Sequence, residues 1–214
     1  MSTWSASSND YNDTNNWTFL HVPTDIDIAF FGPSSFTSPS SYTIPDMFVG
    51  EWIFQSGSPQ YSFTIDGAGA FNFVGAGIIT NGVSVSITVS SGAVLFFENA
   101  STAGSAAITE NGGPVEFDSL STGGTASITN TVRVTFTGYS SAGSAAIHTF
   151  AAASLTFEGF ATSGNAQLIT DAGVRSISTS QRVPPIITNL QWVQFQARVP
   201  TTLVPTSSPC IPEM

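Results

Sequence analysis

The chain has 214 residues, of which 41% are hydrophobic and only 8% are charged, and its formal net charge is -10 at pH 7. It has four arginines and no lysine, so its sequence lacks the clustered positive charge that binds nucleic acid or an anionic membrane, and we expect neither partner. The one cysteine, Cys210, excludes an intrachain disulfide.

Residues 1–36 are predicted to form an amino-terminal cap. Trp4 and Trp17 lie in a stretch rich in Asn and Asp, and the alternation of Ile26, Ile28 and Phe30 indicates a strand before a Gly-Pro turn. The segment has neither the basic nor the apolar part of a secretory signal. No apolar run in the chain is long enough for a transmembrane helix, so we expect no membrane insertion by this chain.

A repeat of about twenty residues occupies the middle of the chain, after a stretch of alternating apolar residues between Tyr61 and Val89. One phenylalanine, one glycine and one branched aliphatic residue recur in each unit at intervals of 20, 19 and 21 residues. The repeated positions are Phe97, Phe117, Phe136 and Phe157; Gly104, Gly124, Gly143 and Gly164; and Ile108, Ile128, Ile147 and Leu168.

Each unit also has two short apolar pairs, Ala-x-Ile and Leu/Val-x-Phe, which indicate two strands with one inward face each. The length of the unit varies only between the aliphatic residue and the next strand. The chain is therefore predicted to be all-β, with a single right-handed parallel β-helix of roughly seven coils over residues 37–179.

The pattern ends near residue 180, and residues 180–214 hold six of the twelve prolines. Ile187, Leu190, Trp192 and Phe195 are predicted to form a closing strand over the last coil. From Pro200 onward we expect an irregular, proline-rich tail.

The repeat resembles a known family, the autotransporter-associated beta-strand repeats of bacterial surface proteins. The resemblance lies in STAG-x-A-x-I-T-N-like units at 101–109, 121–130, 141–147 and 162–168. It extends to the opening of the chain, with Trp4, an Asn-Asn-Trp at 15–17, Pro23, Asp27 and a Phe-Gly at 31–32, and to a Gly-Ala-Gly-Ile at 75–78 followed by Asn81.

The resemblance implies a right-handed parallel β-helix in the passenger region of an autotransporter-like protein, outside a Gram-negative cell. It implies a stalk or adhesive surface and no enzyme. The expected function is therefore non-catalytic, in adhesion or matrix assembly at the outer cell surface or in the extracellular space. Surface glycans, or host or matrix proteins, are the expected partners.

Acidic residues flank the core phenylalanines and are predicted to point outward on one face. Glu98 and Asp118 should lie one rung apart, with Glu116 close by, and Glu158 further along. Three carboxylates in this arrangement suggest a calcium site, whereas a solvated acidic face that keeps the rod soluble is the interpretation we favour. No other cofactor is expected.

Three other functions compete with the adhesive rod. One is a fibre subunit that self-associates end to end or side by side. Another is a polysaccharide-degrading enzyme, although Arg133 is the only arginine within the clear repeats and no acidic cluster lies beside it. The third is an ice-binding solenoid, which needs regular threonine ladders; in the clear repeats His148 and Ile169 occupy positions where Thr109 and Thr129 stand.

Three further features are assigned as surface features. His21 and His148 are predicted to be surface histidines without a metal role, and the Asn/Asp-rich run at 10–16 is predicted to be a turn. The variable loops at 110–114, 130–133 and 148–154 are a second candidate contact site for a partner, beside the acidic face.

Overall fold

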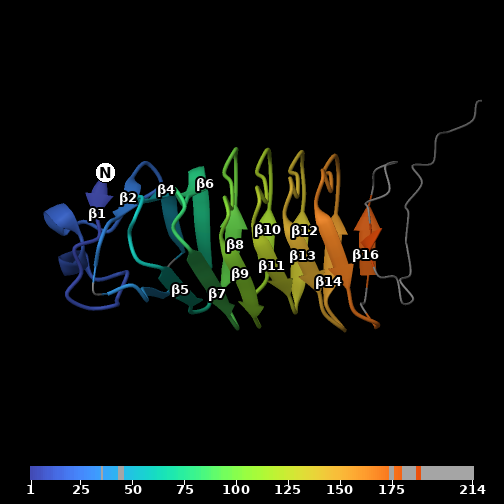
Figure 1. Cartoon of the computed structure of the whole chain (residues 1–214), viewed down its shortest axis with the longest axis horizontal. Coiled ribbons are helices and arrows are strands. Elements are labelled where there is room, and N and C mark those ends of the chain that lie inside the picture. Colours follow the sequence, from blue (N-terminus) through green and yellow to red (C-terminus); the bar gives the residue numbers. More distant parts are fainter. Residues whose placement is uncertain (35, 43–45, 174–175, 180–186, 189–214) are drawn as a thin grey trace, which may run out of the picture.

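The computed structural model describes residues 1–34, 36–42, 46–173, 176–179 and 187–188. They form a rod of parallel strands with the amino-terminal segment at one end (Figure 1). The strands stack as a β-solenoid of about seven turns, which confirms the predicted all-β repeat fold.

Two sheets run along the rod. Counted over the described residues, the first has nine strands, namely β1 (Ser2–Thr3), β2 (Ile28–Phe31), β4 (Met47–Phe54), β6 (Ala70–Ile79), β8 (Val94–Phe97), β10 (Val115–Phe117), β12 (Arg133–Phe136), β14 (Ser154–Phe157) and β16 (Ser176–Thr179). The second has eight, namely β3 (Ser40–Tyr42), β5 (Tyr61–Asp66), β7 (Val85–Ser90), β9 (Ala107–Asn111), β11 (Ser127–Asn130), β13 (Ala146–Thr149), β15 (Gln167–Thr170) and β17 (Ile187–Thr188).

The repeated apolar residues face the space between the two sheets, as predicted. The phenylalanines of β8, β10, β12 and β14, the alanines directly before the opposite strands (Ala106, Ala126, Ala145 and Ala166) and the repeated aliphatic residues within those strands are all buried. From Phe73 to Phe157 the phenyl rings form one continuous stack, with neighbouring centroids 4.5–5.1 Å apart and ring planes 7–9° from parallel. In the coils of β8 to β14, one aromatic ring per coil therefore fills the centre of the rod.

The two edges of the rod differ in regularity. On one edge, the loops at 98–106, 118–126, 137–145 and 158–166 each have nine residues (upper edge in Figure 1). On the opposite edge, the loops at 112–114, 131–132 and 150–153 have three, two and four residues. The prediction that length variation falls on one edge is confirmed.

Within the nine-residue loops a third, short ladder continues the coil. Single parallel bridges connect Thr102, Thr122, Ser141 and Thr162 in series. Two residues later stand the repeated glycines, each with φ between +54° and +62°. At Gly143 an added Cβ would lie 2.8 Å from the carbonyl oxygen of Gly124, so the turn requires glycine for its φ and for its space.

The amino-terminal segment covers the first coil. It contains η1 (Thr14–Asn16) and η2 (Thr18–Leu20), two single-turn helices. Strand β1 adds to the edge of the first sheet beside β2, and the N–H of Tyr11 donates to the carbonyl of Ser40 in β3 at 2.9 Å. Both sheet edges are thus engaged at this end, so end-to-end stacking through it would first require the segment to detach.

The core of this cap is aromatic. Trp4, Tyr11 and Trp17 are buried and lie within 4.9–6.3 Å of one another, measured between ring centroids. Strand β2 confirms the predicted strand, but Ala29 and Phe31 point inward, whereas Ile26 is 88% exposed. The reason is that Phe31 packs on Trp4, Trp17 and Trp52, and a strand that buries one set of residues exposes the other.

The described part of the carboxy-terminal segment is short. Of the predicted closing strand at Ile187, Leu190, Trp192 and Phe195, only β17 (Ile187–Thr188) is described, and it pairs with β15 in parallel. The remainder of that strand and the predicted tail from Pro200 lie outside the described residues.

Candidate functional site

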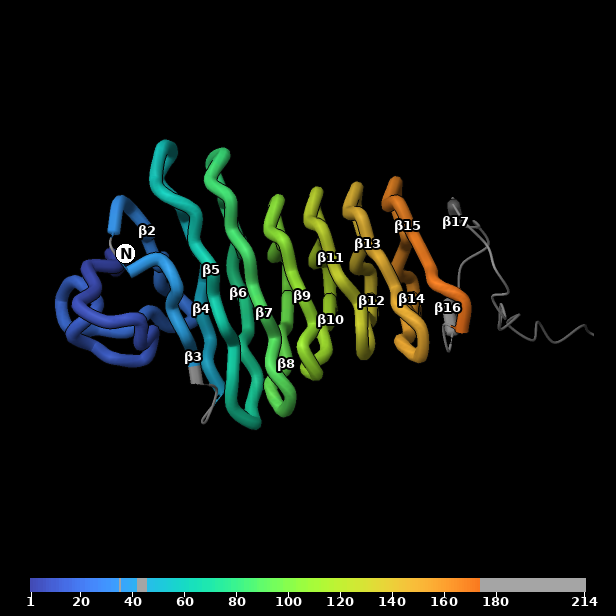
Figure 2. Tube along the Cα trace, turned by 60° about the horizontal axis from the view of Figure 1, so that its bottom comes forward, coloured from blue at the N-terminus to red at the C-terminus, as the bar shows by residue number. Residues whose placement is uncertain are grey.

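The outward face of the second sheet carries a column of threonines. Thr64, Thr88, Thr109 and Thr129 stand on successive strands β5, β7, β9 and β11, each the register partner of the next. We call them the threonine column. Figure 2 shows these strands side by side in one row, followed by β13 and β15.

A second column of small residues runs beside the threonine column, two residues earlier in each strand. It consists of Ser62, Ser86, Ala107, Ser127 and Ala146. The hydroxyl of Ser86 donates to that of Ser62 at 2.9 Å. The two columns together are called the hydroxyl face; they hold no charged residue, and none of their side chains is larger than threonine.

The hydroxyl face ends where larger residues begin. In register with the threonine column, His148 and Ile169 follow on β13 and β15. The Nε2 atom of His148 lies 2.9 Å from Oδ1 of Asp171, and its ring stacks on Phe150 with centroids 4.2 Å apart. His148 is half-buried in these contacts, and its nearest polar partner is a single carboxylate.

The predicted acidic residues lie on the outward face of the first sheet or just beyond it, as expected. Phe97 and Phe117 are register partners, so the next residues, Glu98 and Asp118, lie one rung apart. The hydroxyl of Thr137 donates to Oδ1 of Asp118 at 2.7 Å. Glu158 follows Phe157, two coils beyond Asp118, and is exposed.

Glu116 has a cationic partner. Its Oε1 atom forms an ion pair with a guanidinium nitrogen of Arg133, and both side chains are partly exposed. Within the part of the chain that the structure describes, no group of three or more His, Cys, Asp or Glu side chains is placed to hold a metal ion. The three carboxylates therefore do not form a ready-made site, and calcium binding stays a prediction.

Glu110 is the one acidic residue among those described that is almost completely buried, at 1% exposed. Its Oε1 accepts the N–H of Val115 at 3.1 Å, and its Oε2 accepts the N–H groups of Thr131, Val132 and Arg133 at 2.9, 2.7 and 3.2 Å. Burial raises the pKa of Glu110, and these four hydrogen bonds oppose the rise in part. Glu110 thus holds the start of β10 and the loop at 131–132 together on the variable edge.

Asn130 takes the equivalent position one coil further on. It is buried, and its side-chain nitrogen donates to the carbonyl of Ser154 at 2.8 Å and to the hydroxyl of Thr149 at 3.2 Å. The variable edge is one of the predicted contact sites for a partner. Two of its residues, Glu110 and Asn130, are buried and stabilise the edge from inside.

The polar residues of the cap also make local contacts. Asn16 is buried, and its Oδ1 accepts the N–H groups of Ser7 and Ser8 at 2.9 and 3.2 Å. His21 lies 3.0 Å from Asp27, whose pKa is lowered chiefly by the N–H of Thr24. The hydrogen bonds of Asn16 agree with the Asn/Asp-rich turn predicted at 10–16.

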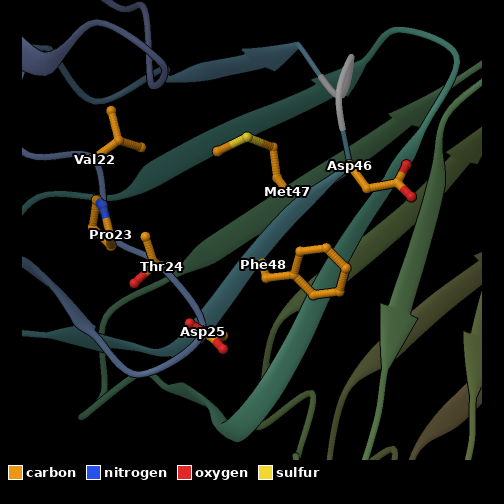
Figure 3. A pocket seen from close by; sticks show the side chains of 7 residues that line it. All are labelled: Val22, Pro23, Thr24, Asp25, Asp46, Met47 and Phe48. Carbon is orange, nitrogen blue, oxygen red and sulfur yellow. The ribbon is translucent and has the colours of Figure 1, made fainter.

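A cavity of about 480 Å³ lies between the cap and the beginning of β4. Its lining residues come from two segments, as Figure 3 shows, and are Val22, Pro23, Thr24, Asp25, Asp46, Met47 and Phe48. Oδ1 of Asp46 already accepts the N–H of Ala70 at 2.8 Å. The cavity includes none of the carboxylates that the sequence singled out.

Comparison with known proteins gives no relative. No protein-family model, curated protein or solved structure matches the chain. None of the helices among the described residues is long and apolar enough to cross a membrane. The structure shows the class of protein, a β-solenoid. Its function is inferred from the chemistry of its surfaces.

Proposed function

We propose that the chain is a non-catalytic β-solenoid of adhesion or matrix assembly, in which the hydroxyl face binds a neutral, hydroxyl-rich polysaccharide. The observation that carries the proposal is the register of the hydroxyl face, with four threonines in one column and only Ser and Ala in the other. The resemblance of the repeat to bacterial surface proteins supports a location outside the cell.

The chemistry of the face fits a neutral polymer. Serine and threonine hydroxyls both donate and accept hydrogen bonds, as do sugar hydroxyls. The methyl groups of threonine and alanine offer apolar contact between them. With no charge in the two columns, the face does not select an anionic or a cationic partner.

The geometry also fits an extended partner. Successive rungs of a parallel sheet are about 4.8 Å apart, so the same contact recurs along the rod. Each contact is weak by itself. A polymer that touches several rungs at once gains affinity through multivalency, with no deep pocket needed.

The test is a depletion assay, in which the full chain is incubated with insoluble neutral polysaccharides such as cellulose, chitin and xylan. The double variant Thr88→Glu, Thr109→Glu places two charges on the hydroxyl face. The matched control, Ser154→Glu with Thr156→Glu, places two charges on the outward side of β14 in the first sheet. We expect the wild-type chain and the control to bind at least one of the polymers, and the hydroxyl-face variant to bind about tenfold or more weakly.

Binding should also change little with salt, because it does not rest on charge. Absence of binding to all three polymers, or equal loss in the two double variants, would contradict the proposal. So would release of reducing ends, which would indicate an enzyme. Inhibition of ice recrystallisation without polysaccharide binding would instead assign the face to ice.

A further inference from the structure

A row of exposed apolar side chains stands on the regular edge of the rod, three residues after the core phenylalanines. It consists of Leu120, Tyr139 and Phe160, which are 67%, 63% and 59% exposed. The rings of Tyr139 and Phe160 stack with centroids 4.8 Å apart and planes 8° from parallel. We call these three residues the apolar ridge; they lie in the nine-residue loops at the upper edge in Figure 1.

The ridge has a different polar neighbour on each side. Toward the first sheet lie the acidic residues Glu98, Asp118 and Glu158, each next to a core phenylalanine. Toward the second sheet lies the short ladder of Thr102, Thr122, Ser141 and Thr162. One flank is therefore acidic, and the other carries only hydroxyl groups.

Three of the four hydroxyl groups on this flank are able to donate to a partner, whereas the hydroxyl of Thr162 already donates to that of Ser141 at 3.2 Å. The oxygens of Thr102, Thr122 and Ser141 accept the N–H groups of Gly104, Gly124 and Gly143 at 3.0–3.1 Å. Because these oxygens act as acceptors toward the glycines, each hydroxyl keeps its own proton for a second hydrogen bond. A carboxylate is the acceptor that makes the strongest bond with such a donor.

The stacking of the ridge argues against a sugar as its partner. Tyr139 and Phe160 cover one face of each other's ring, which leaves fewer free aromatic faces on which a sugar ring could stack. The acidic flank opposes an anionic lipid surface. A second copy of this chain, in contrast, has the same rung spacing and the same ridge.

We propose that the apolar ridge is a self-association interface in which two rods lie side by side and parallel, related by a two-fold axis along the rods. In this arrangement the acidic flank of each copy faces the hydroxyl flank of the other, and ridge packs on ridge. A two-fold axis across the rods would place acidic flank against acidic flank, which is unfavourable. The charge of the flanks thus selects the parallel dimer.

The first test is the oligomeric state of the full chain by sedimentation equilibrium over a wide concentration range. The wild-type chain should dimerise. The triple variant Leu120→Ser, Tyr139→Ser, Phe160→Ser should shift the dimer dissociation constant at least tenfold upward, and since all three side chains are mostly exposed, its fold should survive. Ile26→Ser removes an 88% exposed apolar side chain from the cap and should leave the dimer unchanged.

The second test reads the orientation by disulfide cross-linking in a Cys210→Ser background under mild oxidation. In the parallel dimer every ridge residue faces the same residue of the second chain, so Leu120→Cys and Phe160→Cys should each form a homodimeric disulfide. In an antiparallel dimer centred on Tyr139, neither variant would link to itself, and only a mixture of the two would cross-link.

A further variant tests the role of charge in the dimer. Thr162→Lys places a cation on the hydroxyl flank, opposite Glu158 of the second copy, and should tighten the parallel dimer several-fold at low salt. Weakening of the dimer by Thr162→Lys, cross-linking only in the mixture, or a strictly monomeric wild-type chain would overturn the proposal. The inference is independent of polysaccharide binding, because the Thr88→Glu, Thr109→Glu variant should still dimerise.

Discussion

The phenyl rings of Phe117 and Phe136 stack with their centroids 4.5 Å apart and their planes 7° from parallel. Both rings are fully buried at the centre of the rod. Removing one of them leaves a cavity in the stack between two coils, so Phe117→Ala should lower the free energy of unfolding by about 3–5 kcal/mol. Chemical denaturation monitored by circular dichroism measures the change. Phe117→Leu, which keeps most of the volume, should cost clearly less; equal costs would mean that the ring is not tightly packed.

The glycine turn gives a second prediction. At Gly143 an added Cβ would meet the carbonyl oxygen of Gly124 at 2.8 Å, and φ is +62°. At Gly57 φ is +82° but nothing lies within 4 Å. Gly57→Ala should therefore cost about 1–2 kcal/mol from backbone conformation alone, and Gly143→Ala should cost more because it adds a steric clash. Thermal or urea unfolding of the two variants compares them, and an equal loss of stability would exclude the steric part.

Glu110 gives a third prediction. Its carboxylate accepts four backbone N–H groups, from the start of β10 and from residues 131–133, and an amide in its place would offer one acceptor oxygen and a conflicting NH₂ donor. Glu110→Gln should destabilise the chain by about 1–3 kcal/mol at neutral pH, the cost of leaving buried N–H groups unsatisfied. Hydrogen exchange should show faster exchange at Thr131 and Val132, whereas Glu98→Gln, on the outward face, should change neither quantity.

The pH dependence of stability follows from the same residue. Burial raises the pKa of Glu110 in the folded chain above its value in the unfolded chain. The unfolded chain then loses its proton at a lower pH than the folded chain does. Stability from this group is therefore full below the unfolded pKa and is lost as pH rises through the folded pKa. Unfolding at a series of pH values should show this decline in the wild-type chain, and the decline should be smaller in Glu110→Gln.

Calcium binding at the acidic face is tested by melting the chain in calcium or in a chelator. Glu116 would have to leave Arg133 before it could join Glu98 and Asp118 around a cation. We therefore expect the melting temperature of the wild-type chain to be nearly the same in both conditions, and calcium to stabilise Arg133→Ala more than wild type. A large calcium-dependent rise in the wild-type chain would show that the ion pair does not compete.

The sequence was sufficient to predict the coil and its inward residues, because Phe97, Ile108 and their equivalents recur with one spacing and β-strands alternate strictly. Alternation from Ile108 also places Glu110 inward, yet a charged residue is ordinarily assigned to the surface. Glu110 is nevertheless buried, because backbone N–H groups of a neighbouring loop bind its carboxylate. The sequence does not reveal these donors.

The threonine column is hard to recognise in the sequence for a different reason. Thr64 and Thr88 lie before the four clear repeats, where the spacing of about twenty residues does not hold, so their register with Thr109 emerges only from strand pairing. The apolar ridge could not be predicted from the sequence, because Tyr139 and Phe160 lie in turns, where alternation does not decide which way a side chain points.

Each coil of the solenoid adds one rung to the hydroxyl face, so the length of this face depends on the number of coils. Both columns of the hydroxyl face extend from β5 to β11, and the second column continues to β13. Duplication or loss of one unit would lengthen or shorten the face by one equal step and leave the chemistry of every other rung unchanged. For a polymer partner, avidity would then follow the number of coils, so the reach and strength of such a rod can be adjusted without altering any single contact.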